Sequence, residues 1–363
     1  MSERQVSIVD VAQAAGVSYQ TVSRVINKSG PVRDKTRQKV LEAIDRLHYH
    51  PSWSAKALKT QRTRTIGVIA SQINFSGPLL TLGSLESMAR EHGLFVSLAT
   101  LDENKLTPLD FNEVTESFTR LGVEAIIIVA PTEAILTLAL ENSPHIPLVI
   151  VTAQEGLQSI DTRTFDEQKV KFVFTDVDGV SRDIAQRMVK RGTKTVYFLS
   201  GPHQWRDAVL RENAARRACA AYDMEFSVID VNDWASNAAY DRVTTYIRHH
   251  GKARFAKSAI WAVNDALAVG ALRAFYENGL YAPRDMTIVG YDNMQATESL
   301  VPSLTTVDPN YTEVGSSAMR MVLDMLGYTN GSDTSEVADA VQIAEDTPRA
   351  QIIKPRLIVR ESL

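Results

Sequence analysis

From Thr65 onward, short apolar runs alternate with longer stretches that have the 3.6-residue period of helices. This alternation is typical of parallel α/β proteins. The runs cover residues 66–70, 95–101, 125–129, 148–151, 172–174, 196–199, 227–229, 259–263, 287–289 and 305–307. Ten strands are too many for one compact domain, so the pattern predicts two doubly wound lobes with a ligand cleft at the carboxyl ends of the strands.

The first 50 residues follow a different pattern, that of three short helices. The spacing of Ser7 and Asp10 resembles a capping box at the start of the first helix, and Gly16 is suited to end it. Ser18 is placed to cap a second helix over residues 19–27, and a third is expected over residues 34–48. The sequence therefore predicts a small all-α domain in which a tight glycine turn joins the first two helices.

The second helix has an apolar side and a polar side that contains neither Asp nor Glu. The polar side consists of Gln20, Ser23, Arg24 and Asn27. An isolated helix of this kind is as consistent with an ordinary solvated face as with a binding surface. Side chains of these types also form hydrogen bonds with base edges and phosphates. Their position on a helix that follows a tight turn favours the interpretation as a DNA-binding surface.

The distribution of charge along the chain supports the second interpretation. Residues 1–64 hold twelve Lys and Arg against five Asp and Glu, whereas the other 299 residues hold 27 against 38. The overall net charge of −4 therefore hides a head of +7 and a body of −11. A basic head supplies the phosphate-neutralising charge on which DNA affinity depends, and the acidic body is repelled by the duplex.

The first two helices closely resemble the DNA-binding headpiece of the lactose-repressor/galactose-repressor family. The resemblance rests on Val11-Ala12 and on Val17-Ser18-Tyr19-Gln20-Thr21-Val22-Ser23-Arg24-Val25. It implies a helix-turn-helix in which Tyr19, Gln20 and Arg24 read bases of double-stranded operator DNA in the major groove. It also implies that Ser18, Thr21, Ser23 and Asn27 lie nearer the DNA backbone.

The segment 51–64 is expected to form a short hinge helix followed by a linker. Such a helix is too short to be stable alone in water, so it would become ordered against DNA and a second copy. The family resemblance implies that Ala55 and Leu58 belong to this hinge helix and that Leu58 wedges into the minor groove. The alternative is that Leu58 packs on the third helix.

The resemblance extends to a core like that of periplasmic sugar-binding proteins. We expect a first lobe over about 65–170 plus 308–328 and a second over about 171–307 plus 350–360. Residues 329–349, rich in polar and acidic side chains, are expected to form a flexible insertion before a last strand at about 352–359. The expected domains are therefore a headpiece (1–50), a hinge (51–64) and a two-lobed core (65–363).

Three strand-end segments carry the resemblance in the core: residues 262–270, 289–292 and 302–307. By position, it implies that Asn264 and Asp292 form hydrogen bonds with hydroxyl groups of a sugar-like effector. The alternative for Asn264 is a helix cap after a strand. Aromatic walls for a sugar ring are expected from Phe75, Trp205, Trp234 and Tyr311.

Two positions depart from the family pattern. Val209 is expected where family members usually place a cleft arginine, and Thr152 stands where an Asp is frequent. The cleft is therefore expected to lack its cation, which leaves open a different carbohydrate, a phosphate-free polar metabolite, or no effector.

Other classes of protein are disfavoured. No apolar run reaches the roughly 18–20 residues of a membrane span, and the N-terminus lacks a secretory signal, which also argues against a secreted solute-binding protein. Cys219 is the only cysteine, so no disulfide or thiolate metal cluster is expected. We find no phosphate loop, nucleophile elbow or metal-spaced histidine pair, so we expect no enzyme activity, cofactor or metal.

Together these features predict a cytoplasmic, nucleoid-associated regulator, most simply a repressor. We expect a homodimer on a pseudo-palindromic operator, because symmetry in protein and DNA should match. The chain ends at Leu363, soon after the last strand, so no tetramer-forming helix is expected. Effector binding would release the DNA through different affinities of two states, with co-repression as the alternative polarity.

Overall fold

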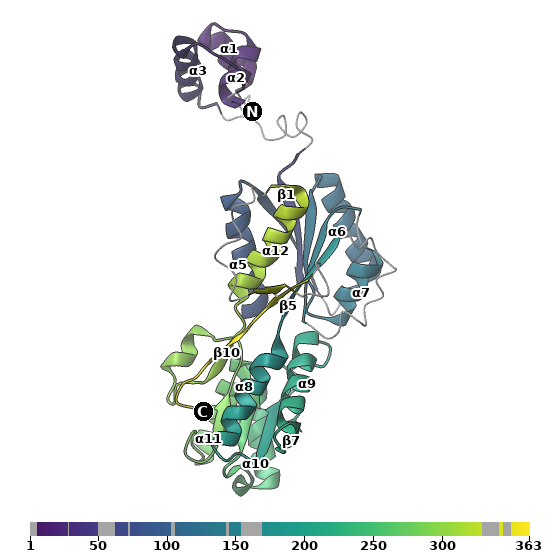
Figure 1. Cartoon of the computed structure of the whole chain (residues 1–363), viewed down its shortest axis with the longest axis vertical. Coiled ribbons are helices and arrows are strands. Elements are labelled where there is room, and N and C mark those ends of the chain that lie inside the picture. Colours follow the sequence, from purple (N-terminus) through teal and green to yellow (C-terminus); the bar gives the residue numbers. More distant parts are fainter. Residues whose placement is uncertain are drawn as a thin grey trace. The chain divides into compact units, whose positions relative to one another are not determined.

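The computed structural model describes residues 6–27, 29–49, 62–71, 73–102, 106–142, 145–153, 169–328, 341–343 and 350–363. The chain divides into two compact units, with the boundary between Arg64 and Thr65 (Figure 1). Each unit has its own hydrophobic core. Among the described residues, no helix has both the length and the apolar character that crossing a bilayer requires.

The first unit contains the three expected helices. They are α1 (Ile8–Ala15), α2 (Tyr19–Asn27) and α3 (Asp34–Arg46). Ser7 and Asp10 form the predicted capping box, and Gly16 ends α1 at φ 66°, a left-handed conformation that glycine adopts without steric cost. The predicted start and stop of α1 are therefore confirmed.

A small apolar core holds the three helices together. Val11, Val22 and Val40, one from each helix, are completely buried. Burying a side chain of this size contributes about 1.5–3 kcal/mol relative to leaving it exposed. Since these residues occupy one side of each helix, the polar side of α2 remains directed away from the core.

The first sheet of the second unit has seven strands in the order β11-β12-β5-β4-β3-β1-β2, parallel except for the pairing of β11 with β12. Its strands are β1 (Thr65–Ser71), β2 (Phe95–Leu101), β3 (Ala125–Val129), β4 (Leu148–Val151), β5 (Val170–Thr175), β11 (Val341–Ile343) and β12 (Ala350–Ile353). Helices α5 (Ser76–Glu91) and α12 (Tyr311–Leu326) pack on one face of it. Helices α6 (Pro108–Leu121) and α7 (Glu133–Glu141) pack on the other (Figure 1).

Each face of this sheet has its own core because successive strand residues point to opposite sides. In β3, Ile127 packs with α5 and α12, whereas Ile126 and Ile128 pack with α6 and α7. The continuous apolar run of β3 is thus that of a strand covered on both faces, as parallel sheets require.

The second sheet has four parallel strands in the order β7-β6-β8-β9. These are β6 (Thr195–Leu199), β7 (Glu225–Ile229), β8 (Ala259–Ala262) and β9 (Thr287–Val289). The accompanying helices are α8 (Val177–Lys190), α9 (Arg206–Ala220), α10 (Ser236–His250) and α11 (Asp265–Glu277), with short 3₁₀ helices η3 (Lys252–Phe255) and η4 (Gln295–Ser299). Strands β10 (Thr306–Asp308) and β13 (Arg356–Ile358) pair separately as an antiparallel ribbon.

All ten predicted apolar runs coincide with strands, but the expected lobe boundaries were wrong. We expected the second lobe to begin near residue 171 and to include 350–360. Instead β5 and β12 pair with each other and belong to the first sheet. The expected last strand is divided between β12 and β13, and residues 341–343 of the expected insertion form β11. The physical reason is that hydrogen bonding to neighbouring strands decides sheet membership, and apolar composition alone cannot report it.

The packing of α11 against α10 yields a test of the fold. A Cβ on Gly270 would lie 1.9 Å from the backbone oxygen of Ser236, so the helices would have to separate. We expect Gly270→Ala to lower the free energy of unfolding by about 1–3 kcal/mol or more, measured by urea denaturation. Gly83→Ala, in the exposed part of α5 with nothing within 4 Å, is the matched control and should stabilise by about 0.5–1 kcal/mol. Equal effects of the two substitutions would contradict the described helix packing.

Candidate functional site

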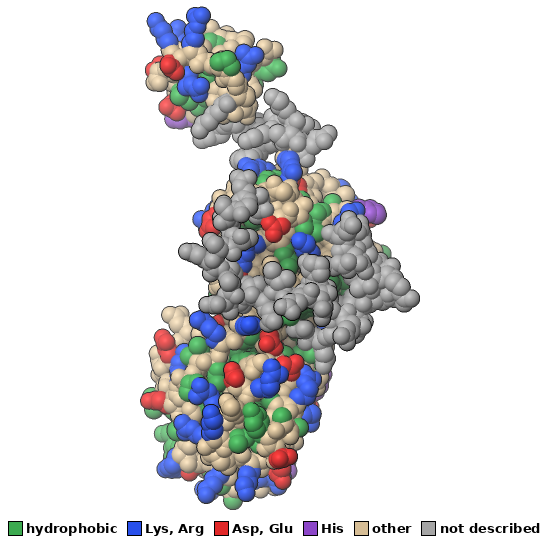
Figure 2. All heavy atoms as spheres, in the orientation of Figure 1, with side chains coloured by type: hydrophobic (Ala, Val, Ile, Leu, Met, Phe, Trp, Pro, Cys, Tyr) green, Lys and Arg blue, Asp and Glu red, His purple; other side chains and the backbone are tan. Residues whose placement is uncertain are grey.

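The polar side of α2 presents side chains that the protein itself leaves unused. Tyr19, Gln20 and Arg24 are exposed, and their side chains have no hydrogen-bond partner among the described residues. Lys and Arg side chains are visible on the face of this headpiece shown in Figure 2. Exposed, unpartnered donors and acceptors on a helix that follows a tight turn are available to an external partner such as DNA.

The other predicted DNA-contacting residues of this unit are engaged locally. Ser18 Oγ accepts a hydrogen bond from the backbone N–H of Thr21 at 3.3 Å, so Ser18 caps α2 as predicted. The side-chain amide of Asn27 donates to the backbone oxygen of Ser23 at 2.9 Å and lies 3.2 Å from its hydroxyl. These side chains are therefore held in place beside the three that are free. Ala55 and Leu58 lie outside the described residues.

The core contains a cavity of about 240 Å³ lined by residues of both lobes. All six side chains predicted to surround an effector line it: Phe75, Trp205, Trp234, Asn264, Asp292 and Tyr311. Phe75 precedes α5 and Tyr311 begins α12, both in the first lobe, whereas the other four belong to the second lobe. The structure thus brings together residues that are up to 236 positions apart in the sequence.

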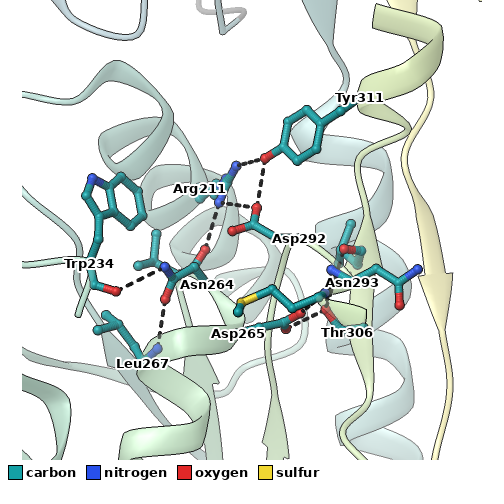
Figure 3. A network of polar contacts seen from close by, with 12 residues as sticks. Arg211, Trp234, Asn264, Asp265, Leu267, Asp292, Asn293, Thr306 and Tyr311 are labelled. Atoms are coloured by element: carbon teal, nitrogen blue, oxygen red, sulfur yellow. Dashed lines mark hydrogen bonds and ion pairs between the residues drawn. The ribbon is translucent and has the colours of Figure 1, made fainter. Parts of the chain in front are cut away.

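Arg211, on α9, lies at the centre of the polar wall of this cavity (Figure 3). Its Nη1 donates to the carbonyl oxygen of Val263 at 2.9 Å and lies 3.3 Å from Oδ1 of Asp292. Its Nη2 donates to the Tyr311 hydroxyl at 3.1 Å, and that hydroxyl donates to Asp292 Oδ1 at 2.8 Å. Since Tyr311 comes from the first lobe, this triangle of hydrogen bonds connects the two lobes.

Asp292 depends on this arrangement in two ways. Burial raises the pKa of Asp292, and the adjacent Arg211 guanidinium and the hydrogen bond from Tyr311 oppose that rise. Its backbone has φ 106°, a conformation that side-chain-bearing residues rarely adopt and that concentrates at functional sites. Removing Arg211 would leave a buried carboxyl group without its counter-charge.

The expectation that Val209 removes the cation from the cleft was wrong. Val209 is 37% exposed and lies in a separate outer hollow beside Glu133 and Arg206. The cleft cation is present two residues later, as Arg211. The periodicity of α9 was the available signal, because Asp207, Arg211 and Ala214 follow one another at three- and four-residue spacing on its inward side. Thr152 does line the cavity, where its hydroxyl donates to the backbone oxygen of Ala130 at 2.9 Å.

Asn264 is a helix cap as well as a cavity residue. Its Oδ1 accepts from the backbone N–H of Leu267 at 2.8 Å, and its Nδ2 donates to the backbone oxygen of Trp234 at 3.3 Å. The alternative interpretation of Asn264 as a cap is therefore confirmed. Its bond to the backbone of Trp234 also links the start of α11 to the segment that carries this cavity residue.

The apolar wall is an aromatic cluster that joins both lobes. Trp205 and Trp234 meet edge to face with ring centroids 5.2 Å apart, and Phe75 lies 5.6 Å from Trp205 and 6.3 Å from Trp234. Rings in this geometry stabilise one another by about 0.5–1.5 kcal/mol beyond the burial of their area. A cavity with aromatic rings on one side and hydrogen-bonding groups on the other is suited to a polar ring compound.

The groups around the cavity are those of a binding site. Among the described residues, no group of three or more His, Cys, Asp or Glu is placed to hold a metal ion. The described lining residues that carry a carboxyl or guanidinium group are Asp207, Arg211 and Asp292, and the last two are paired. This arrangement can hold and orient a ligand by hydrogen bonds and ring contacts.

Comparisons with known proteins give the same two-part division. Residues 7–52 match the family described as bacterial regulatory proteins, lacI family. Residues 185–363 match the family described as periplasmic binding protein-like domain. The two matches cover the helical headpiece and the larger part of the core.

Similar proteins match over most of the chain. Catabolite control protein A of Priestia megaterium is 28% identical over 322 residues, which are 87% of this chain and 91% of that protein. The lactose operon repressor of Escherichia coli (strain K12) is 26% identical over 325 residues, which are 89% and 85% of the two chains. These relatives are regulators rather than enzymes, in agreement with the expectation from the sequence.

A solved structure shows the same fold. The crystal structure of the Lac repressor dimer bound to operator and the anti-inducer ONPF matches with a TM-score of 0.80 and 22% sequence identity. The match covers 99% of each chain. The combination of a helix-turn-helix headpiece with a two-lobed, periplasmic-binding-protein-like core of parallel sheets, predicted from the sequence, is thereby confirmed.

A buried carboxyl group behind the cavity gives the stability a predictable pH dependence. Asp265 is completely buried, accepts from Thr306 Oγ1 at 2.6 Å and from the backbone N–H of Met294 at 2.8 Å, and thereby holds the loop that carries Asp292. Burial and the nearby Asp292 raise the pKa of Asp265 to about 7. Since the folded protein holds this proton more tightly than the unfolded chain, the contribution to stability is lost as pH rises through 7.

We therefore expect the free energy of unfolding of the wild-type protein to fall by roughly 2–3 kcal/mol more than that of Asp265→Asn when the pH is raised from 5 to 8. Asparagine imitates the neutral acid and does not titrate, so it removes this dependence. Denaturation curves at the two pH values measure the difference. Parallel changes in the two proteins would show that Asp265 does not carry the effect.

Proposed function

We propose that the chain is a DNA-binding transcriptional repressor of the lacI type, as its headpiece match and its relatives support, and that a small sugar-like effector bound between its core lobes controls it. The proposal rests mainly on one observation: the same chain has a helix, α2, with exposed polar side chains and a cavity with an aromatic wall and a polar wall. The site of action we propose is operator DNA of the nucleoid, in the cytoplasm.

We propose that α2 enters the major groove and that Tyr19, Gln20 and Arg24 contact base edges there. Their exposure and their lack of partners among the described residues support this assignment. Ser18, Thr21, Ser23 and Asn27 would lie nearer the phosphates. The segment 51–64, including Ala55 and Leu58, is proposed to act as the hinge that contacts the minor groove.

We propose that the repressor works as a homodimer that joins through the outer surfaces of its core. On the second lobe, Val301 is 98% exposed and Tyr276 is 67% exposed, beside a shallow hollow that Leu272 and Leu300 also line. Exposed apolar groups clustered in this way are typical of protein interfaces. The similar Lac repressor structure is a dimer on its operator, which supports a second copy of this chain as the occupant.

We propose that the hydrogen-bonded triangle of Arg211, Asp292 and Tyr311 couples the cavity to the lobes. An effector hydroxyl that donates to Asp292 competes with the hydroxyl of Tyr311, the only one of the three residues from the first lobe. Its binding therefore exchanges a contact between lobes for contacts with ligand, so the two states of the core differ in ligand affinity. A change in lobe orientation transmitted to the hinges would then lower operator affinity.

Base reading by α2 is tested by Gln20→Ala. We expect the loss of preference at one base position, equivalent to about 1–3 kcal/mol of discrimination, because a bidentate side-chain contact is removed. Selection of binding sites from a random DNA library, followed by fluorescence anisotropy, measures the preference. Gln38→Ala, on the exposed side of α3, is the control and should keep it. An unchanged preference in Gln20→Ala would contradict the groove assignment.

Coupling through the triangle is tested by Tyr311→Phe, which keeps the ring and removes the hydroxyl. We expect operator affinity without effector to fall by about threefold or more, because a hydrogen bond of about 0.5–1.5 kcal/mol to the second lobe is lost. Tyr328→Phe is the control, since the Tyr328 hydroxyl donates to Glu124 at 3.0 Å within the first lobe. Equal operator affinities of the two variants would contradict a coupling role for Tyr311.

A further inference from the structure

The charges in the cavity wall restrict the chemistry of the effector. Three described lining residues carry a carboxyl or guanidinium group, namely Asp207, Arg211 and Asp292. The single cation among them, Arg211, is already committed to Asp292, Tyr311 and the backbone of Val263, and it lies 3.7 Å above the ring of Tyr291. The described wall therefore offers no free positive charge to a ligand.

Asp207 is the ionisable group of the wall that the protein leaves unsatisfied. Its carboxyl group has no hydrogen-bond partner among the described residues. The neighbouring Arg206 does not supply one, because its guanidinium bonds to Glu133 and lines the separate outer hollow. Burial raises the pKa of Asp207, which Arg211 and Arg206 oppose, but neither protonation state of Asp207 contributes a positive charge.

Side chains of the protein occupy the N-termini of α9 and α11 at the cavity, whereas α5 also begins there without an acidic residue in its first turn or a side-chain cap. The N-terminus of a helix attracts anions through its dipole and its free N–H groups. Asp207 already stands in the first turn of α9, and Asn264 caps α11. An acidic side chain of the protein thus occupies the place that a ligand anion would use at α9.

From this arrangement we propose that the effector is an uncharged sugar and that Asp207 excludes sugar phosphates and sugar acids. Burying a phosphate or carboxylate beside Asp207 without a free cation would incur a large desolvation cost and direct repulsion. Ring hydroxyls, in contrast, can donate to Asp207 and Asp292 while the C–H face of the ring packs on the aromatic wall. This inference rests on the proposed function and adds the charge class of the effector.

The test is isothermal titration calorimetry of the full-length protein with matched pairs of probes. The panel comprises glucose, galactose, mannose, fructose and ribose, each beside its terminal phosphate ester, together with glucuronate and glucosamine. We expect at least one uncharged sugar to bind at least tenfold more tightly than its phosphate ester. Tighter binding of any phosphate ester, of glucuronate or of glucosamine, or no binding of any uncharged sugar, would overturn the proposal.

Asp207→Asn makes the test specific, because it removes the charge and retains the shape of the side chain. The ratio of affinities between the sugar and its phosphate should fall at least threefold in this variant. Glu212→Gln is the matched control on the same helix, since Glu212 pairs with Arg216 outside the cavity. An unchanged ratio in Asp207→Asn, or an equal change in both variants, would overturn the role of Asp207.

The same preparations are assayed for sequence-specific operator binding, so that a failure of the proposed function can be distinguished from a failure of the inference about the effector. If the protein binds its operator specifically but prefers sugar phosphates, the proposed repressor function stands and the proposal of an uncharged effector is wrong. Absence of specific operator binding would reject the proposed function itself.

Discussion

The buried guanidinium of Arg211 is the interaction on which the organisation of the core cavity depends. It forms hydrogen bonds with Asp292, whose backbone has φ 106°, and with the Tyr311 hydroxyl from the other lobe. It also donates to the carbonyl oxygen of Val263, the residue that follows strand β8. A buried charge is stable only when it is paired and its donors are used, and here each of its contacts belongs to a different segment. The same pairing that satisfies Arg211 also leaves the described cavity wall without a free cation.

Most of the fold follows from local patterns in the sequence. The headpiece helices and all ten apolar runs were predicted because helix caps and hydrophobic periodicity act within a few residues. Lobe membership was not predictable in this way. The chain passes between the lobes near residues 176, 309 and 354. Strand β5 joins the first sheet by pairing with β4, and β12 joins it by pairing with β5. Such pairings are decided by contacts between distant segments, which apolar runs do not encode.

The candidate site was predictable in part, for reasons that differ between residues. Resemblance to the family placed Asn264, Asp292 and the aromatic residues around one cavity, where the structure also has them. It failed at α9, because an offset of two residues moves a side chain by about 200° around a helix. Counting along α9 from Asp207 would have identified Arg211 instead of Val209. The hydrogen-bond partners of the Arg211 guanidinium could not be predicted from the sequence, since they come from three separate segments.

The most direct test of the account is whether occupation of the core cavity changes operator binding by the headpiece. Fluorescence anisotropy of the full-length protein on its selected operator, titrated with the sugar that calorimetry identifies, measures this coupling. The account predicts that saturation with sugar weakens specific operator binding at least tenfold while binding to unrelated DNA changes little. A sugar that binds in the cavity and leaves operator affinity unchanged would contradict it.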